Sequence, residues 1–381
     1  MPGLVGLIVN PVAGAGGRVG LHGTDGAELY AEAVRRGGTA ASLPRAARAL
    51  RRMALPSSTR LLAAPGVMGA GLAAASGLDV TALAMPLRAA VSTTGAPTMA
   101  VRTTAADTVV AAQMLAEAGV ELLVFVGGDG TARDIAAALP PGLPVVGVPG
   151  GVKMRSGVFG TSPEAAADVV SDFARGGGRP LAEAEILDAA ADGAGSEFHG
   201  MITVPGAGGR LAGAKSFTMS GSPVELDALC AATAADLAPG VLYLFGPGST
   251  TAGVLAQLGL PGTALGVDAV RDGQLVGTDL SEQEITTLMD QAGHTRLVLG
   301  VIGGQGFLLG RGNQQLGPAV LSRLTPADLV IIATTAKLAA LSPPRLLIDT
   351  GDEAAFSGFR GYHRVRTGPS RYMMMQVATA A

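Results

Sequence analysis

The chain has little of what several classes of protein require. It has one cysteine, Cys230, which excludes an internal disulfide and a cysteine-based zinc site. It has no tryptophan and only 3% aromatic residues, so it lacks the ring platforms on which single-stranded nucleic acids stack. Its formal net charge of -3 is also unlike that of a nucleic-acid binder. We therefore expect no nucleic-acid partner.

The sequence also has no long apolar run. No stretch approaches the roughly 18 consecutive apolar residues of a membrane span. The first apolar run, residues 4–9, has no basic segment before it and is shorter than the core of a signal peptide. Cys230 lies between Leu229 and Ala231, which indicates a buried thiol that packs like a small apolar residue. These features predict a cytoplasmic protein without a membrane partner.

Glycine, in contrast, is abundant: it accounts for 57 of 381 residues, about twice the usual share of roughly 7%. Apolar segments with strand character alternate with amphipathic helical segments from end to end, which predicts an α/β fold. The length favours two domains. We place the first domain at residues 1–178, ending in a run of three glycines, and the second at 179–340. The final segment, 341–381, is expected to pack back on the first domain.

The segment around Asp129 joins a buried strand to a tight turn. Residues 122–126 form a continuous apolar run, typical of a strand buried on both faces of a parallel sheet. Three glycines then surround Asp129, and Thr131 is placed to cap the helix that follows. A strand end, free backbone amides and a helix N-terminus together make a phosphate site. Because a carboxylate repels phosphate, we expect Asp129 to serve a hydroxyl or a metal ion, and the helix dipole to keep it ionised at neutral pH.

Other polar, glycine-rich loops follow further predicted strands. Asn10 begins the loop after the first strand, and Lys153 lies in the loop after the strand at 145–148. Lys153 is one of three lysines and is well placed to contact a phosphate. Asn10 and Asn313, the two asparagines, either bind a ligand or cap turns. Four arginines of one predicted helix are interpreted as its solvated face: Arg45, Arg48, Arg51 and Arg52. Neither a GxxxxGK[ST] sequence nor a convincing dinucleotide fingerprint is present.

Two local motifs of the second half predict backbone structure. The Arg271-Asp272-Gly273 sequence predicts a type I′ hairpin turn, and Ser281-Glu282-Gln283-Glu284 predicts the capping box of a helix.

Two of these motifs carry a resemblance to a known family. The sequences Asn10-Pro11-x-Ala13-Gly14-x-Gly16-Gly17 and Gly127-Gly128-Asp129-Gly130-Thr131 together resemble those of NAD kinases and diacylglycerol kinases. The order of the loops at 20–26, 150–157, 246–251 and 303–315 is similar to a bacterial branch described as predicted ATP-NAD kinases or polyphosphate/ATP-NAD kinases, which includes accessory proteins of acetoin catabolism. The resemblance implies an N-terminal α/β nucleotide domain with a parallel sheet, a C-terminal domain with more β structure, and an active site between them.

The resemblance also implies what the site binds and which residues bind it. We expect Mg²⁺, ATP or polyphosphate as the phosphoryl donor, NAD as the likeliest acceptor, and a homodimer. Asp129 matches the catalytic aspartate, which acts as the general base for the acceptor hydroxyl or holds the metal. Cofactor contacts are expected from Asn10, Gly14, Gly16, Gly17, Gly127, Gly128, Gly130, Thr131, Lys153, Gly248, Ser249 and Thr250. Substrate contacts are expected from Asp25, Arg155, Asp268, Gln305, Arg311 and Asn313.

The sequence departs from the family in the part that recognises the acceptor. NAD kinases carry an Asn-Glu pair that binds the adenosine of the acceptor, and no Asn-Glu dipeptide occurs in this chain. The loop at 246–250 only loosely matches their Thr-Pro-x-Gly-Ser-Thr sequence. Two alternatives therefore stay open: a kinase for another small-molecule or nucleoside hydroxyl, and a non-catalytic protein that binds NAD or a nucleotide.

Overall fold

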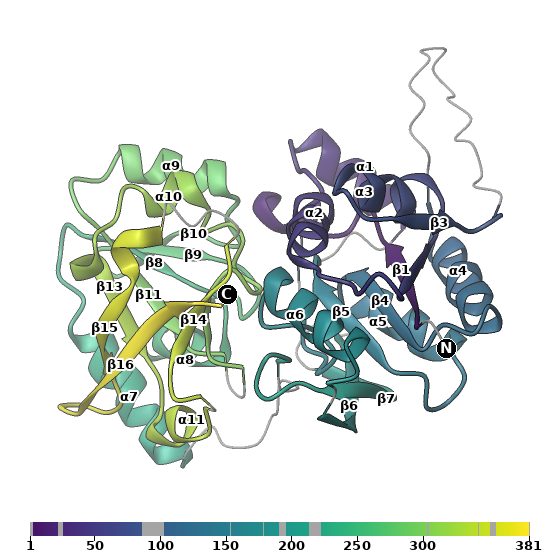
Figure 1. Cartoon of the computed structure of the whole chain (residues 1–381). Helices are drawn as coiled ribbons and strands as arrows, with labels where there is room; N and C mark the ends of the chain where they lie inside the picture. Colours follow the sequence, from purple (N-terminus) through teal and green to yellow (C-terminus); the bar gives the residue numbers. More distant parts are fainter. Residues whose placement is uncertain are drawn as a thin grey trace.

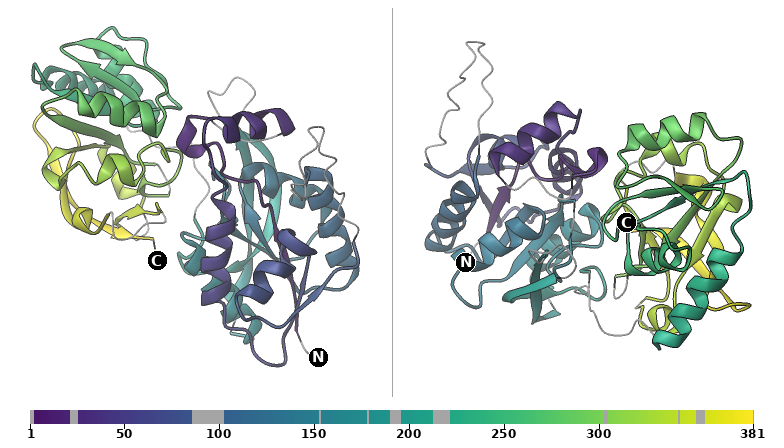
Figure 2. Two further views of the ribbon diagram at one scale, coloured as in Figure 1. Left: turned by 90° about the horizontal axis from the view of Figure 1, so that it is seen from above. Right: turned by 180° about the vertical axis from the view of Figure 1, so that it is seen from behind.

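The chain forms two α/β domains that lie side by side (Figures 1 and 2). The computed structural model describes residues 3–21, 26–85, 103–152, 154–177, 179–189, 196–212, 222–302, 305–341, 343–350 and 356–380. One domain is built around a sheet of five strands and the other around a sheet of nine. Within the described ranges, no helix combines the length and apolar character needed to cross a membrane.

The N-terminal sheet is parallel, with the strand order β3-β2-β1-β4-β5. Its strands are β1 (Leu4–Val9), β2 (Arg60–Ala63), β3 (Val80–Ala82), β4 (Leu122–Gly127) and β5 (Val145–Pro149). Every residue of β4 is buried, which confirms the prediction of a strand covered on both faces. The sheet thereby brings the loops after β1, β4 and β5 to one edge, because the carboxyl ends of parallel strands point the same way.

Helices cover both faces of this sheet. One face packs against α2 (Ser42–Arg52), α3 (Ala70–Ala75) and α6 (Pro163–Ala174). The other face packs against α4 (Ala105–Glu117) and α5 (Asp129–Ala138). The remaining N-terminal helices are α1 (Ala27–Arg35), η1 (Gly17–Val19) and η2 (Gly66–Met68). Ala33 of α1 packs on Ala15 and Val19, so this helix covers the glycine-rich loop after β1.

A hairpin extends the N-terminal domain past the expected boundary at residue 178. Its strands, β6 (Arg179–Ala189) and β7 (Ser196–Gly206), contribute Ile186 and Val204 to the apolar cluster under α4 and α5. These buried side chains complete the core on that face, so the hairpin belongs with the first sheet. The expected start of the second domain at 179 is therefore too early.

The C-terminal sheet has nine strands, which confirms the prediction of a second domain with more β structure. The strand order is β10-β9-β8-β11-β13-β15-β16-β14-β12. The strands are β8 (Leu242–Phe245), β9 (Asp268–Arg271), β10 (Gln274–Gly277), β11 (Thr295–Gly300), β12 (Phe307–Leu309), β13 (Leu329–Ile332), β14 (Leu346–Ile348), β15 (Gly361–Arg366) and β16 (Tyr372–Thr379). Neighbouring strands from β8 through β11 and β13 to β15 run parallel.

Two groups of helices pack on the C-terminal sheet. On one face, α7 (Pro223–Ala235) and α8 (Ser249–Gln257) cover side chains of β8, β11 and β13. The larger cluster on the other face includes residues of α9 (Glu282–Asp290), α10 (Pro318–Leu321), α11 (Thr335–Ala339) and η4 (Ser357–Phe359). The short η3 (Pro326–Asp328) leads into β13.

The final segment does not form a unit on the first domain. Its strands β14, β15 and β16 lie inside the nine-stranded sheet, and Val365, Met375 and Val377 are buried in the C-terminal core. The expectation that 341–381 packs back on the N-terminal domain is therefore wrong for these strands. The segment still contacts the first domain through single residues: Asp349 pairs with Arg45, and the carbonyl of Ala380 accepts a 3.4 Å hydrogen bond from Thr161 Oγ1.

Several local predictions have clear outcomes. The Arg271-Asp272-Gly273 turn joins β9 to β10 with positive φ at Asp272 and Gly273, as a type I′ turn requires. Ser281 and Glu284 form the expected capping box of α9. Cys230 is buried, and burial raises the pKa of its thiol to about 11. Thr131, however, is not a cap, because α5 begins two residues earlier with Gly128 as its N-cap.

Candidate active site between the two domains

Asp129 is the first residue of α5, at the end of the central strand. Its carboxylate is 4% exposed and accepts hydrogen bonds from the next loop. The backbone N–H of Arg155 donates to both carboxylate oxygens, at 2.9 and 2.7 Å. Ser156 donates from its backbone N–H at 3.0 Å and from Oγ at 2.8 Å. The loop after β5 therefore holds the carboxylate in one orientation.

Burial dominates the electrostatics of this carboxyl group. Loss of water raises the pKa of Asp129 to about 7, although the hydrogen bonds from Ser156 and Arg155 lower it. The expectation that the helix dipole keeps Asp129 fully ionised at neutral pH is therefore wrong. A pKa near 7 leaves the group divided between its two protonation states, which is the range in which a general base works best.

The two flanking loops close over the end of β4. Asn10 donates from Nδ2 to Thr131 Oγ1 at 3.0 Å, and its Oδ1 accepts from the backbone N–H of Val12 at 3.2 Å. Gly14 has φ +82°, and a Cβ there would lie 2.5 Å from the carbonyl oxygen of Gly150. Only glycine permits this approach of the β1 loop to the β5 loop. The loops after β1, β4 and β5 thus pack directly against one another.

The loop after β4 is itself shaped by glycine. A Cβ on Gly127 would lie 2.5 Å from Thr131 Oγ1, the atom that Asn10 binds. Gly128 and Gly130 are partly exposed beside the buried Asp129. No side chain caps the N-terminus of α5. The backbone N–H groups of its first turn are therefore placed to bind an anion, as at other helix N-termini.

The C-terminal domain contacts these loops directly. A Cβ on Gly17 would lie 3.0 Å from Cβ of Gln314, whose Nε2 donates to the carbonyl of Val152 at 2.8 Å. Gln305 donates from Nε2 to the carbonyl of Met154 at 3.2 Å. Gln305 was predicted from sequence, whereas Gln314 was not. Both amides bind the loop that holds Asp129.

A buried ionic cluster joins the domains. Arg45 of α2 donates from Nη1 to Asp349 Oδ2 at 2.7 Å and from Nη2 to its carbonyl at 2.8 Å. Arg311 approaches the same carboxylate oxygen at 3.3 Å and donates from Nη2 to the carbonyl of Gly160 at 2.8 Å. Burial lowers the pKa of Arg311 to about 10, which leaves it charged. Arg45 is therefore not part of a solvated face, as the sequence had suggested.

A cavity of about 320 Å³ lies against this junction. Backbone of Gly14, Gly151 and Gly310 contributes to its wall, and three arginines line it: Arg18, Arg45 and Arg48. Among the described residues no acidic side chain lines the cavity. Glu164, Asp349 and Glu282 pair with Arg48, Arg45 and Arg18 from outside the lining. Arg48 Nη1 is buried without a hydrogen-bond acceptor among the described residues. Guanidinium groups and glycine backbone are suited to oligophosphate anions.

The remaining predicted residues have other surroundings. Asn313 caps its own turn: Oδ1 accepts from Gly310 N–H at 2.7 Å, and Nδ2 donates to the carbonyl of Leu308 at 3.0 Å. Arg155 donates from Nη1 to Ser196 Oγ of the β6–β7 hairpin at 2.9 Å. Gly16 lies in the loop between β1 and η1, where its carbonyl accepts from Leu21. Asp25 and Lys153 lie outside the described residues.

A second predicted group lies within the C-terminal domain. Gly248 is the N-cap of α8, followed by Ser249 and Thr250, and neither side chain caps the helix. Thr250 Oγ1 accepts from Lys337 Nζ at 3.1 Å. Asp268 accepts from Thr263 and from the Asp279 N–H, and burial raises its pKa. These hydrogen bonds join parts of the C-terminal domain to one another and do not reach Asp129.

Three functional candidates besides Gln314 were missed in the sequence for different reasons. Ser156 directly follows a predicted site residue in the loop after β5, so its position could have suggested it. Arg18 and Asp349 are separated by 331 positions in the chain, and only the fold brings them to the same cavity. Arg18 lines it, and Asp349 pairs with Arg45, which also lines it. No group of three His, Cys, Asp or Glu suited to a metal occurs in the described part of the chain.

Comparison with known families bears on this arrangement. Residues 5–177 match the ATP-NAD kinase N-terminal domain, and residues 239–377 match the ATP-NAD kinase C-terminal domain. The chain belongs to the ATP-NAD kinase family. No match was found among curated proteins or among solved structures.

Membership of the ATP-NAD kinase family supports a phosphotransferase that uses ATP and acts on a NAD-like substrate. The two matched regions fall on the two sheets. The cavity is lined by residues of both regions, and its three arginines come from the first.

Proposed function

We propose that this chain transfers the γ-phosphoryl group of ATP to the 2′-hydroxyl of the adenosine ribose of NAD, with Asp129 as the general base. The observation that carries this proposal is a buried carboxyl group with a pKa of about 7, in loops adjoining a basic cavity between the domains. Membership of the ATP-NAD kinase family supports the donor and the class of acceptor.

In the proposed reaction, the acceptor hydroxyl replaces Ser156 Oγ as a hydrogen-bond donor to Asp129. This is the hydrogen bond that can be exchanged most easily, because the other donors are backbone groups fixed by the β5 loop. The hydroxyl oxygen attacks the γ-phosphorus as Asp129 takes its proton. The bond from the γ-phosphorus to the β–γ bridging oxygen breaks, and its electron pair leaves with ADP.

The arginines of the cavity bind the phosphates in this proposal. Arg18, Arg45 and Arg48 line the cavity, and their guanidinium groups place positive charge beside the phosphates. Mg²⁺ supplies charge neutralisation when it is bound to ATP. It needs few protein ligands because the phosphates and water provide most of its coordination, which agrees with the lack of an acidic cluster among the described residues.

The test is formation of NADP by the purified full chain with Mg-ATP and NAD. We expect NADP and ADP in equal amounts by mass spectrometry, and a loss of NADP formation in Asp129→Asn. Asp290→Asn is the control, since it removes a carboxylate from the exposed end of α9. Replacing ATP by inorganic polyphosphate tests the second donor. A wild-type protein that makes no NADP from either donor at high enzyme concentration contradicts the proposal.

A different hydroxyl acceptor is the second candidate, and the missing Asn-Glu dipeptide favours it. Acceptor-dependent release of ADP with a panel of nucleosides and small alcohols tests it.

A third candidate is a non-catalytic nucleotide-binding protein, favoured by the four hydrogen bonds with which the chain itself holds Asp129. It predicts that NAD or ADP raises the melting temperature while no acceptor releases ADP from ATP.

A further inference from the structure

One face of the C-terminal sheet is only partly covered. The helices α7 and α8 pack over β8, β11 and β13, but the same face of β15 and β16 carries exposed side chains. The register pairs Tyr362 with Gln376, Arg364 with Met374 and Arg366 with Tyr372, which places these residues on one face. Tyr362 is 71% exposed and Met374 is 57% exposed. The sheet thus leaves a shelf beside the end of α7.

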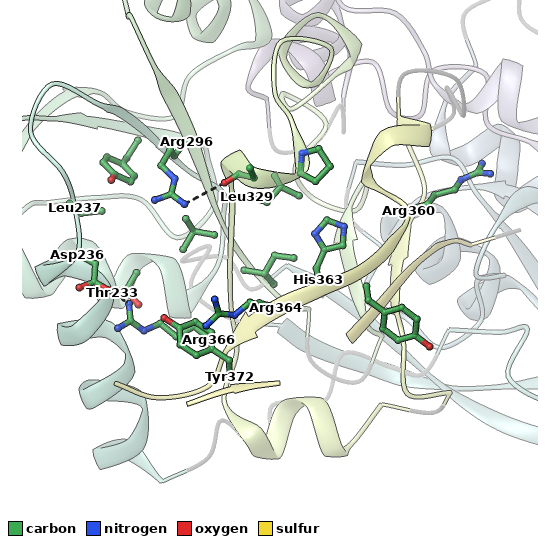
Figure 3. Close-up of a pocket in the computed structure, with 16 residues that line it drawn as sticks. Thr233, Asp236, Leu237, Arg296, Leu329, Arg360, His363, Arg364, Arg366 and Tyr372 are labelled. Atoms are coloured by element: carbon green, nitrogen blue, oxygen red, sulfur yellow. Dashed lines mark hydrogen bonds and ion pairs between the residues drawn. The ribbon is translucent and has the colours of Figure 1, made fainter. Parts of the chain in front are cut away.

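A cavity of about 600 Å³ lies over this shelf (Figure 3). Its volume is within the range of small-molecule sites, about 300–1,000 Å³. The lining includes four arginines, contributed by β11, β15 and the residue before β15: Arg296, Arg360, Arg364 and Arg366. Asp236 is the acidic residue in this lining. The cavity is therefore strongly basic in a chain whose net charge is -3.

The arginines differ in how far the protein neutralises them. Arg366 forms an ion pair with Asp236 at 2.7 Å and donates to the carbonyls of Gly368 and Pro369. Arg364 lies over the ring of Tyr372, 4.1 Å from its centroid, and Arg296 makes a 3.4 Å hydrogen bond to the carbonyl of Ala327. Neither Arg296 nor Arg364 pairs with a carboxylate in the described part of the chain. Two guanidinium groups thus line the same cavity without a carboxylate partner among the residues that the structure describes.

We propose that this cavity is a second, separate binding site for an oligophosphate anion, either free or carried by a nucleotide. Planar guanidinium groups bind phosphate oxygens in pairs, and several of them on one wall favour a ligand with several charges. The exposed ring of Tyr362 provides a face on which a base can stack. A symmetric contact with a second copy would bring like charges together, so the charge pattern favours the anion.

This site is distinct from the interdomain cavity. Its lining comes entirely from the C-terminal domain, whereas the wall at the domain junction includes Gly14, Arg45 and Arg48 of the N-terminal domain. The inference therefore does not depend on the acceptor of the proposed kinase reaction. Failure of NADP formation leaves it intact, and loss of this site leaves the role of Asp129 untouched.

Hydrogen exchange with inorganic triphosphate or ATP as the probe tests the proposal on the full chain. We expect either probe to slow amide exchange in residues 326–331 and 361–366. The double variant Arg296→Gln/Arg364→Gln should lose this protection and weaken triphosphate binding to this site at least tenfold by calorimetry. Protection at the β1 and β5 loops should persist in that variant.

The matched control is Arg51→Gln/Arg323→Gln, which removes the same charge from exposed positions on α2 and after α10. It should keep both the protection and the affinity. Protection by ATP alone also supports the site and identifies the nucleotide as its ligand. The proposal is overturned if neither probe protects residues 326–331 and 361–366, or if the control variant loses affinity as the pocket variant does.

Discussion

The chain contains two similar strand, glycine-loop and helix units with different surroundings. In each, a fully buried strand, β4 or β8, leads through glycine into a helix whose glycine N-cap has no side-chain capping bond. In the β4–α5 unit, an acid begins the helix, and loops from β1, β5 and the other domain meet around it. In the β8–α8 unit, Thr250 accepts from Lys337 inside one domain.

The difference shows what the backbone motif alone does not determine. Both helix ends offer free N–H groups to an anion, but only the first adjoins a basic cavity shared by two domains. Lys337 is half-buried, and partial loss of water lowers its pKa, so its contact with Thr250 is a partly buried polar contact inside the C-terminal domain. The chemistry depends on which loops the fold brings to the helix end.

The largest expected effect comes from removing the acid that distinguishes the two units. Asp129→Asn keeps the size of the side chain and should lower kcat for phosphoryl transfer by about 10²- to 10⁴-fold, the range for loss of a general base. KM for ATP should change little, because the arginines remain. Steady-state kinetics measure both constants. A kcat within threefold of wild type would show that Asp129 only supports the fold.

The β4–α5 unit lies beside the buried Arg45–Asp349–Arg311 cluster, which the β8–α8 unit lacks, and breaking this cluster should destabilise the protein. Asp349→Asn leaves Arg45 and Arg311 buried without their common carboxylate, and the free energy of unfolding should fall by about 3–5 kcal/mol. Glu164→Gln is the control. Glu164 is the partner of Arg48 and is more exposed than Asp349, so its loss should lower the free energy of unfolding by only about 0–1 kcal/mol. Urea denaturation gives both values, and equal losses would contradict the assignment.

The pH dependence tests the buried carboxyl group. The base must be ionised, so kcat/KM should rise about tenfold per unit as pH rises toward 7 and level off above it.

The folded-state pKa is raised above the unfolded value, so the stability that this group contributes is complete below about pH 4 and is lost as pH rises through 7. In Asp129→Asn, melting temperatures should lack this fall. A pH-rate profile without an inflection near 7 would count against the proposed base.

The smallest effect is expected in the second unit. Thr250→Val keeps the side-chain shape and removes the acceptor for Lys337, which should cost about 0.5–1.5 kcal/mol of stability through loss of a partly buried hydrogen bond. Urea denaturation measures this loss, and Ser249→Ala, at the neighbouring residue with no capping role, is the control. An increase in KM for ATP or NAD in Thr250→Val would place this unit in the active site as well.

The sequence was sufficient for features that depend on neighbouring residues. The alternation of strands and helices, the buried β4, the type I′ turn at Asp272 and the Ser281 capping box all follow from local patterns, and each is confirmed. The two motifs around Asn10 and Asp129 also pointed to one site, because parallel strands bring their carboxyl ends together.

The sequence was not sufficient where burial is decided by distant segments. Arg45 has the pattern of a solvated arginine, yet Asp349, 304 positions away, makes it a buried ion pair. The helix dipole suggested an ionised Asp129, but the closed loops above it remove water and outweigh that effect. The final strands were misplaced because nothing local distinguishes a strand of the first sheet from a strand of the second.

The Arg45–Asp349–Arg311 cluster has a consequence for how the molecule comes apart. Separating the domains takes the Asp349 carboxylate away from Arg45 and the carbonyls of Gly160 and Thr161 away from Arg311, and the loss of partners by buried charges is costly. The two domains should therefore melt in one calorimetric transition rather than two. Heating should then open the interdomain cavity and the distant shelf of the C-terminal sheet in the same transition.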